Sequence, residues 1–160
     1  VAIIAIIGST LGREIMAGRR PGLVSFGVIH FAGYLFFLLM PVEALVPYYL
    51  AAGDSALVLI GLSVVTGLLA QMIDYGIGYI VSERVIDTLI SRAQFEKLKA
   101  TFHRWGGWAI FTLNLFPLSS PNMLLVSGIM RYNRLKAISI STGGLLLKYV
   151  VIVLLTDAVG

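Results

Sequence analysis

The sequence predicts an all-α polytopic membrane protein, and three observations support this fold class. Hydrophobic residues make up 58% of the 160-residue chain, and its mean hydropathy is +0.93. Charged residues are only 12%, against about 25% in soluble domains, so a soluble helical domain would lack polar side chains for its surface. Several uncharged stretches also approach the ~20 residues that a helix needs to cross ~30 Å of hydrocarbon. We therefore expect residues 1–160 to form a single membrane domain.

The first clear spanning helix is predicted over residues 22–40, which carry no charge. Residues 1–12 are expected to form an interfacial or truncated first helix. Within the first span, His30 is interpreted as a hydrogen-bonded structural residue. His30 and His103 are too far apart in the sequence to indicate a metal site, and the absence of cysteine from the sequence excludes disulfides and thiolate ligands.

Residues 41–53, PVEALVPYYLAAG, are too short to span a bilayer and too apolar for an ordinary loop. A proline inside a helix removes a backbone hydrogen bond. Pro41 and Pro47 therefore predict a broken helix with Glu43 between the two breaks. We expect this segment to be a re-entrant hairpin that enters the membrane and returns to the same face.

A second spanning helix is predicted over residues 55–81, interrupted chemically only by Gln71 and Asp74. The glycines of the segment YGIGY at 75–79 are interpreted as positions where another helix packs closely. Residues 83–105 then change composition, with five basic and three acidic residues and apolar side chains at helical spacing. This pattern is typical of an amphipathic helix that lies on the membrane surface.

Residues 106–128 contain a second proline-broken segment. The apolar run after residue 106 lasts about 11 residues before Pro117, a length that suits a half-spanning helix. The stretch LFPLSSPNMLLVSG follows, with Pro121 as its second break. We expect a second re-entrant hairpin here, followed by a last spanning helix from about residue 137 to 155.

The distribution of basic residues predicts the orientation. Eleven of the twelve Lys and Arg residues fall in three connecting segments, and cytoplasmic connectors carry an excess of basic residues. With all three segments in the cytoplasm, the two hairpins enter from opposite faces. The net charge of +4 is therefore interpreted as a sign of cytoplasmic connectors rather than of nucleic-acid binding.

The two hairpins also begin two similar halves. Each half has a proline-broken segment, a glycine, a short polar link and a glycine-containing spanning helix. Such paired interruptions are typical of inverted-repeat transporters and point to their central site. Chance similarity between apolar helices is the alternative explanation.

Three ionisable residues are the candidates for transport or proton coupling, because a charge at membrane depth costs ~2.5–3.5 kcal/mol or more. Glu43 lies in the first hairpin, Asp74 in the second span and Lys148 near the middle of the last span. A buried Lys148 requires a carboxylate partner, for which Glu43 and Asp74 are the candidates. The alternatives are an exposed Glu43 at the outer interface, an Asp74 near the cytoplasmic interface, and a purely structural ion pair.

Ser119, Ser120 and Asn122 lie at the break in the second hairpin. Short polar side chains of this kind cap helix starts, so one interpretation is that they only satisfy the backbone. The other is a binding site for a phosphate-bearing head group, because the N-terminus of a half-helix attracts anions. The signatures of soluble enzymes are absent from the sequence, and we expect neither an enzyme nor a bound cofactor or metal.

From Pro41 to Leu155 the chain resembles the DedA family, also called the VTT or SNARE-associated Golgi protein family. The resemblance rests on the order and spacing of several elements: P-x-E-x-x-x-P from Pro41 to Pro47, Ala52-Gly53, YGIGY at 75–79, RWGG at 104–107, F-P-x-x-x-P from Phe116 to Pro121, and SG at 127–128. It implies two re-entrant hairpins entering from opposite faces, and the flipping or scrambling of a lipid such as undecaprenyl phosphate or a phospholipid. It also implies coupling to protons or sodium, with Glu43 as the hairpin acid.

The chain departs from the family where many members carry arginines around the second hairpin. Asn114 and Ser120 stand at these places. Arg131, Arg134 or Lys148 then replaces the missing positive charge, or the cargo depends less on phosphate.

The function expected from the sequence is a multi-pass transporter of the cell membrane that moves a lipid head group between leaflets. The alternatives are a proton- or cation-coupled transporter of a small solute and a non-transporting membrane adaptor. Self-association as a homo-oligomer is left open.

Overall fold

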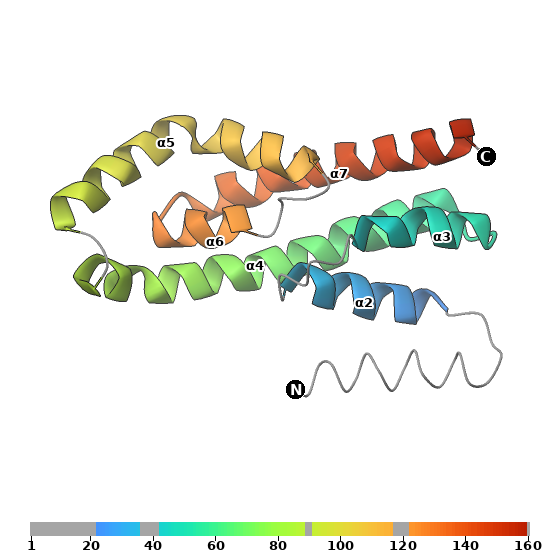
Figure 1. Ribbon diagram of the computed structural model, residues 1–160, viewed down its shortest axis with the longest axis horizontal. Helices are drawn as coiled ribbons and strands as arrows, with labels where there is room; N and C mark the ends of the chain where they lie inside the picture. The colour runs from blue at the N-terminus through green and yellow to red at the C-terminus, as the bar shows by residue number, and fades with distance from the viewer. Residues whose placement is uncertain (1–21, 36–41, 89–90, 117–121, 160) are drawn as a thin grey trace.

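The computed structural model describes residues 22–35, 42–88, 91–116 and 122–159 (Figure 1). Every regular element in these ranges is helical, which confirms the all-α class for the described part of the chain. In chain order, the elements are α2 (Leu23–Leu35), the 3₁₀ helix η1 (Val42–Ala44), α3 (Leu45–Ala51), α4 (Ala56–Thr88), α5 (Arg92–Leu115), α6 (Asn122–Ile129) and α7 (Arg134–Val159).

Helix α4 is the longest element and runs along most of the molecule (Figure 1). Helices α2, α3, α6 and α7 all contact it, and α5 packs along α7. The short helix α3 also contacts α7, and α6 contacts α4, α5 and α7. Both short helices therefore lie against the long ones, in the segments where the sequence predicted hairpins.

Within the described ranges, two helices are long and apolar enough to cross a membrane, over Ala56–Val81 and Arg134–Ala158. They contain 26 and 25 residues, or ~37–39 Å at 1.5 Å per residue, which exceeds the ~30 Å of a hydrocarbon core. Along the middle of α4 the outward side chains are large and apolar at a spacing of four, while several of the inward ones are polar or small. The outward residues are Val65, Leu69, Ile73 and Ile77, and the inward ones are Ser63, Gly67, Gln71, Asp74 and Gly78.

The bounds of the predicted surface helix require correction. Residues 83–88 continue α4, and α5 begins at Arg92 because Ser91 and Gln94 form a capping box. Helix α5 then continues through the expected boundary at residues 105–106 to Leu115. A methyl group on Gly106 would overlap the ring of Phe102, so this glycine accommodates an aromatic side chain inside a continuous helix.

The bounds of the spanning helices also differ from those expected. Helix α7 begins at Arg134, three residues earlier than predicted, where the side chain of Asn133 accepts a hydrogen bond from Lys136 N at 3.0 Å. Helix α2 covers Leu23–Leu35 of the predicted 22–40 span. Residues 1–12 and 36–40 lie outside the described residues.

Pro47 was predicted to break the first hairpin but lies within the first turn of α3. A proline is tolerated there because backbone N–H groups in the first turn have no partner within the helix. The chain turns instead after α3, where Gly53 adopts a φ of 94° and its N–H donates to Leu50 O at 2.9 Å. The other predicted breaks, Pro41, Pro117 and Pro121, lie outside the described residues.

Helices α4 and α6 approach at a pair of glycines. A methyl group on Gly78 would overlap the carbonyl oxygen of Leu125, and one on Gly128 would overlap that of Tyr75. Small residues permit such close backbone contact. The prediction of helix packing at YGIGY is thus confirmed for Gly78, whereas a methyl group on Gly76 would meet nothing within 4 Å.

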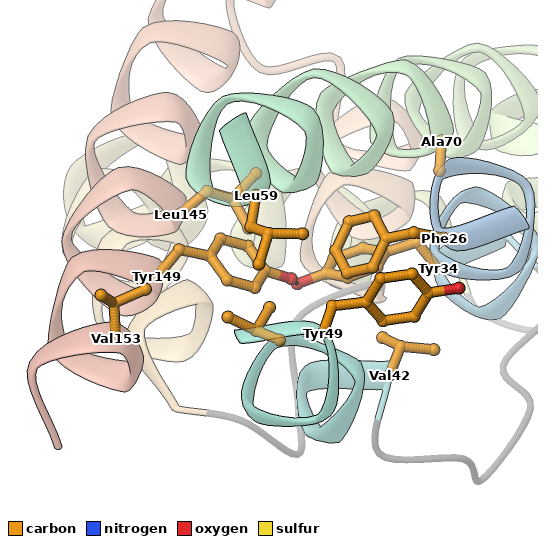
Figure 2. Close-up of a cluster of buried hydrophobic side chains, with 10 residues drawn as sticks. Phe26, Tyr34, Val42, Tyr49, Leu59, Ala70, Leu145, Tyr149 and Val153 are labelled. Carbon is orange, nitrogen blue, oxygen red and sulfur yellow. Dashed lines mark hydrogen bonds between the residues drawn. The ribbon is translucent and has the colours of Figure 1, made fainter. Parts of the chain in front are cut away.

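The larger hydrophobic cluster joins α2, α3, α4 and α7 (Figure 2). Its centre contains three buried tyrosines, Tyr34, Tyr49 and Tyr149. A buried tyrosine needs a partner for its hydroxyl group, so this cluster brings polar atoms into an apolar interior. The hydroxyls of Tyr34 and Tyr149 form hydrogen bonds with residues of the candidate site.

Candidate functional site

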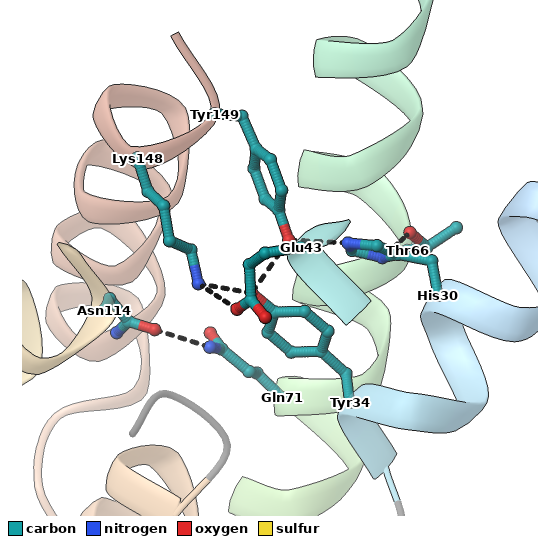
Figure 3. Close-up of polar contacts among 8 residues, drawn as sticks. All are labelled: His30, Tyr34, Glu43, Thr66, Gln71, Asn114, Lys148 and Tyr149. Carbon is teal, nitrogen blue, oxygen red and sulfur yellow. Dashed lines mark hydrogen bonds and ion pairs between the residues drawn. The ribbon is translucent and has the colours of Figure 1, made fainter. Parts of the chain in front are cut away.

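A buried ion pair lies between two segments far apart in the sequence. Lys148 Nζ donates to Glu43 Oε1 at 3.0 Å, and the two residues are only 2% and 8% exposed (Figure 3). Of the two carboxylates considered as partners of Lys148, the structure pairs it with Glu43. The alternative of an exposed Glu43 is therefore wrong. Burying two charges is costly unless they are paired and hydrogen-bonded. Glu43 therefore supplies the carboxylate partner that a buried Lys148 requires.

Local packing places both members of the pair. Lys148 and Ser141 are both buried and seven residues apart, so they share the inward face of α7. Glu43 belongs to η1, which contacts α2. A methyl group on Gly33 of α2 would overlap Val42, so this glycine permits the close approach that carries Glu43 inward.

A chain of hydrogen bonds extends from Lys148 into the contact between α2 and α4 (Figure 3). Lys148 Nζ donates to the hydroxyl of Tyr34 at 2.6 Å. The hydroxyls of Tyr34 and Tyr149 are 2.9 Å apart, and that of Tyr149 lies 2.6 Å from His30 Nε2. His30 Nδ1 lies 2.7 Å from Thr66 Oγ1. The interpretation of His30 as a hydrogen-bonded residue is thus confirmed, and its partners lead to the ion pair.

A second polar network lies beside the ion pair (Figure 3). Gln71 Nε2 donates to Asn114 Oδ1 at 2.6 Å, and Ser141 Oγ donates to Gln71 Oε1. Asn114 Nδ2 donates to the carbonyl of Ile110 at 2.8 Å. All three side chains that form the network are fully buried. Asn114, which stands where the resembled family often has an arginine, therefore holds α4 and α5 together.

Asp74 is 2% exposed and lies three residues after Gln71, on the same face of α4. The buried atom Asp74 Oδ2 accepts no hydrogen bond from the part of the chain that the structure describes. A buried carboxylate oxygen without a donor is costly. Asp74 is thus buried inside the protein but does not pair with Lys148. Its depth in a membrane stays a prediction.

Arg131 lies apart from the ion pair. Its side chain is exposed in the turn after α6, where its φ is 51°, and its guanidinium lies 5.0 Å from the ring centroid of Tyr79. Thr66 belongs to the hydrogen-bond chain that reaches Lys148. Tyr79 lies 13 residues beyond Thr66 on α4, which is a distance of ~20 Å along the helix axis. The structure therefore does not bring Arg131 together with Lys148.

The other predicted head-group residues, Ser119 and Ser120, lie outside the described residues, as does the side chain of Asn122. Among the residues described, no group of three or more His, Asp or Glu side chains could hold a metal ion.

The chain was compared with protein-family models, curated proteins and solved structures, and none of them matches. The resemblance to the DedA family consequently stays a prediction from the motifs. The geometry of the site is the basis of the functional argument.

Sequence reasoning missed the four hydrogen-bonding partners Tyr34, Thr66, Ser141 and Tyr149. A signal for two of them was present in the spacing. Tyr34 follows His30 by four residues and Lys148 follows Ser141 by seven, so each pair lies on one helix face. Which faces meet could be known only from the fold.

Proposed function

We propose that the protein is a lipid transporter of the DedA type, which moves a lipid head group between the leaflets of the cell membrane. The observation that carries the proposal is the Glu43–Lys148 ion pair, buried among helices whose outer faces are apolar. Ionisable residues inside a membrane are rare, face the protein interior and mark transport pathways. The pair supplies both a cation for a phosphate and an acid for an exchangeable proton.

The outer surface supports a location in lipid. Large apolar side chains are exposed along α4 and α7, among them Leu57, Ile80, Leu154 and Leu155, which are at least 60% exposed. Soluble monomers rarely expose extended apolar surfaces. In the proposed arrangement these helices cross the bilayer, the basic connectors face the cytoplasm, and α3 and α6 belong to re-entrant hairpins of an inverted repeat.

An open apolar groove supports lipid rather than a soluble solute as the cargo. It has a volume of about 610 Å³ and lies between α2 and α4, within the usual range of roughly 300–1,000 Å³ for ligand sites. Its lining is Leu23, Val24, Gly27, Val28, Val58, Gly61, Leu62 and Val65. Leu62 also accepts a hydrogen bond from Thr66 at 2.7 Å, so the groove borders the polar chain that leads to Lys148.

The burial of Glu43 and Asp74 favours the proposal over a membrane adaptor. An adaptor predicts that both acids face head groups or water, whereas they are 8% and 2% exposed. In the proposed mechanism, a phosphate-bearing head group competes with Glu43 for Lys148. Protonation of Glu43, or a sodium ion beside it, then compensates the released carboxylate.

Leaflet exchange of a fluorescent phospholipid in liposomes tests this function. We expect wild-type protein to accelerate exchange, and Glu43→Gln and Asp74→Asn to slow it, because each removes an ionisable group from the path. Glu96→Gln is the matched control, since Glu96 is exposed on α5. Circular dichroism and size-exclusion chromatography check that each variant is folded. Wild-type rates in both buried variants would rule out the assigned roles.

Uptake of a soluble solute, with no lipid exchange by the wild-type protein, would support the small-solute alternative. No exchange and no uptake would support the adaptor.

A further inference from the structure

The partners of Thr66 determine the tautomer of His30. Thr66 Oγ1 lies 2.7 Å from the carbonyl oxygen of Leu62, which can only accept a hydrogen bond. The single hydroxyl hydrogen of Thr66 is therefore donated to Leu62. The 2.7 Å contact between His30 Nδ1 and Thr66 Oγ1 then requires the hydrogen to be on Nδ1.

The tautomer in turn determines the direction of every other bond in the chain. A neutral His30 with a hydrogen on Nδ1 has only a lone pair on Nε2. The hydroxyl of Tyr149, 2.6 Å away, must therefore donate to Nε2. Because Tyr149 has no second hydrogen, Tyr34 donates to Tyr149 at 2.9 Å and presents its lone pair to Lys148 Nζ.

The bonds thus all run in one direction, from the ammonium group to a backbone carbonyl. Lys148 donates to Tyr34, Tyr34 to Tyr149, Tyr149 to His30, His30 to Thr66 and Thr66 to Leu62. Hydrogen bonds aligned in this way polarise and strengthen one another. The far end of the chain therefore influences how strongly Tyr34 accepts from Lys148.

Ring stacking holds His30 in the orientation that the chain requires. The imidazole stacks on Phe26 with an interplanar angle of 16° and on Tyr34 with an angle of 30°. All of these residues are buried. The ring is consequently held with one nitrogen toward α4 and the other toward α7.

We infer that His30 is a positioning residue for the Glu43–Lys148 pair, acting through Tyr149 and Tyr34. As a neutral Nδ1–H tautomer it makes Tyr34 a donor to Tyr149, and this strengthens Tyr34 as an acceptor for Lys148. The opposite tautomer would donate to Tyr149 and reverse both tyrosine hydroxyls, so that Tyr34 would accept from Tyr149 as well as from Lys148 and would be the weaker acceptor for the ammonium group. This inference rests on the proposed role of the ion pair in transport.

The tautomer can be measured directly by ¹⁵N NMR of histidine-labelled protein in lipid nanodiscs, because the two tautomers give different ring correlations. His30→Gln assigns the signal by removing it and leaving that of His103. We expect the Nδ1–H tautomer in wild-type protein and in Thr66→Ser, which keeps the hydroxyl. Thr66→Val removes the acceptor and should give a mixture of tautomers.

Leaflet exchange provides the second measurement. Removing the residue that orients a metal-binding histidine typically costs roughly 10–100-fold in affinity or activity. By analogy, we expect a loss of about tenfold in Thr66→Val and near wild-type rates in Thr66→Ser. Tyr149→Phe, which interrupts the chain but leaves Thr66 in place, should slow exchange and keep the Nδ1–H tautomer.

The two measurements separate the failure of this inference from the failure of the proposed function. An Nε2–H or charged His30 in the wild-type protein, or an unchanged tautomer in Thr66→Val, would overturn the inference even if lipid exchange is observed. A wild-type exchange rate in Tyr149→Phe would overturn it as well. Absence of exchange by the wild-type protein would reject the transport function, whichever tautomer is found.

Discussion

Removing one charge of the Glu43–Lys148 pair should destabilise the protein more than removing both. Glu43→Gln leaves a buried ammonium group, and Lys148→Met leaves a buried carboxylate. The side chains of Lys148 and Glu43 are 1% and 10% exposed, so water cannot replace the lost partner. The double variant leaves no charge in the same space.

The magnitude follows from the distance between the charges. Two unit charges 3.0 Å apart attract by about 5.5 kcal/mol at an effective dielectric constant of ~20. Breaking a buried pair by removing one partner typically costs ~3–5 kcal/mol, whereas replacing both partners by neutral groups is often close to neutral. We expect Glu43→Gln to lie at the lower end of this range, because Lys148 keeps its hydrogen bond to Tyr34.

The assay is reversible unfolding in mixed micelles, followed by circular dichroism and arranged as a double-mutant cycle. The free energy of unfolding of the double variant should be no lower than that of either single variant. The ion pair between Glu96 and Lys99 is the control, since its charged atoms are 3.8 Å apart and its side chains are 63% and 31% exposed. Exposed pairs contribute roughly 0–1 kcal/mol, so the same cycle there should show little coupling.

Additive losses at Glu43 and Lys148 would refute the reasoning, because they would mean that the two charges do not stabilise each other. Single variants as stable as the wild-type protein would refute it too. They would imply that water reaches the pair. Coupling of equal size in the exposed control pair would show that the assay does not report burial.

Two further predictions concern the packing around the site. Gly78→Ala and Gly128→Ala should each lower the free energy of unfolding, because the added methyl group meets the backbone of the facing helix. Gly76→Ala is the control, because it has open space around it and should be neutral or stabilising by up to ~1 kcal/mol. Equal effects at all three positions would contradict close packing of α4 on α6. Gln71→Leu should destabilise by ~1–3 kcal/mol, because Asn114 loses a buried partner; thermal melts in detergent check this, and an unchanged melting temperature would contradict it.

Much of the fold could be predicted from the sequence, because helix formation and apolar character are largely local properties. The all-helical class and the approximate extents of the helices now labelled α4 and α7 follow from length, hydropathy and spacing. Helix ends were predicted less well. The start of α5 depends on a capping box at Ser91, and the continuity of the helix through Gly106 depends on how Phe102 packs.

The candidate site was predicted in part. Charge in an apolar chain identified Glu43, Asp74 and Lys148, because each must be compensated wherever it is buried. The need of Lys148 for a carboxylate was also evident. The sequence did not show which acid supplies this carboxylate. The choice depends on how η1 and α7 are rotated toward each other, and the two paired residues are 105 positions apart in the sequence.

By itself, the sequence determined that this protein is helical, apolar and supplied with a few ionisable groups that need partners, because composition and periodicity act within single helices. Only the tertiary structure decided that Lys148 pairs with Glu43, that Asp74 Oδ2 receives no hydrogen bond within the described residues, and that His30 reaches Lys148 through two tyrosines. The physical reason is that each of these facts requires two or more helix faces to meet. A contact between faces depends on packing and close backbone approach, as at Gly33. The hydropathy of a segment predicts neither of these.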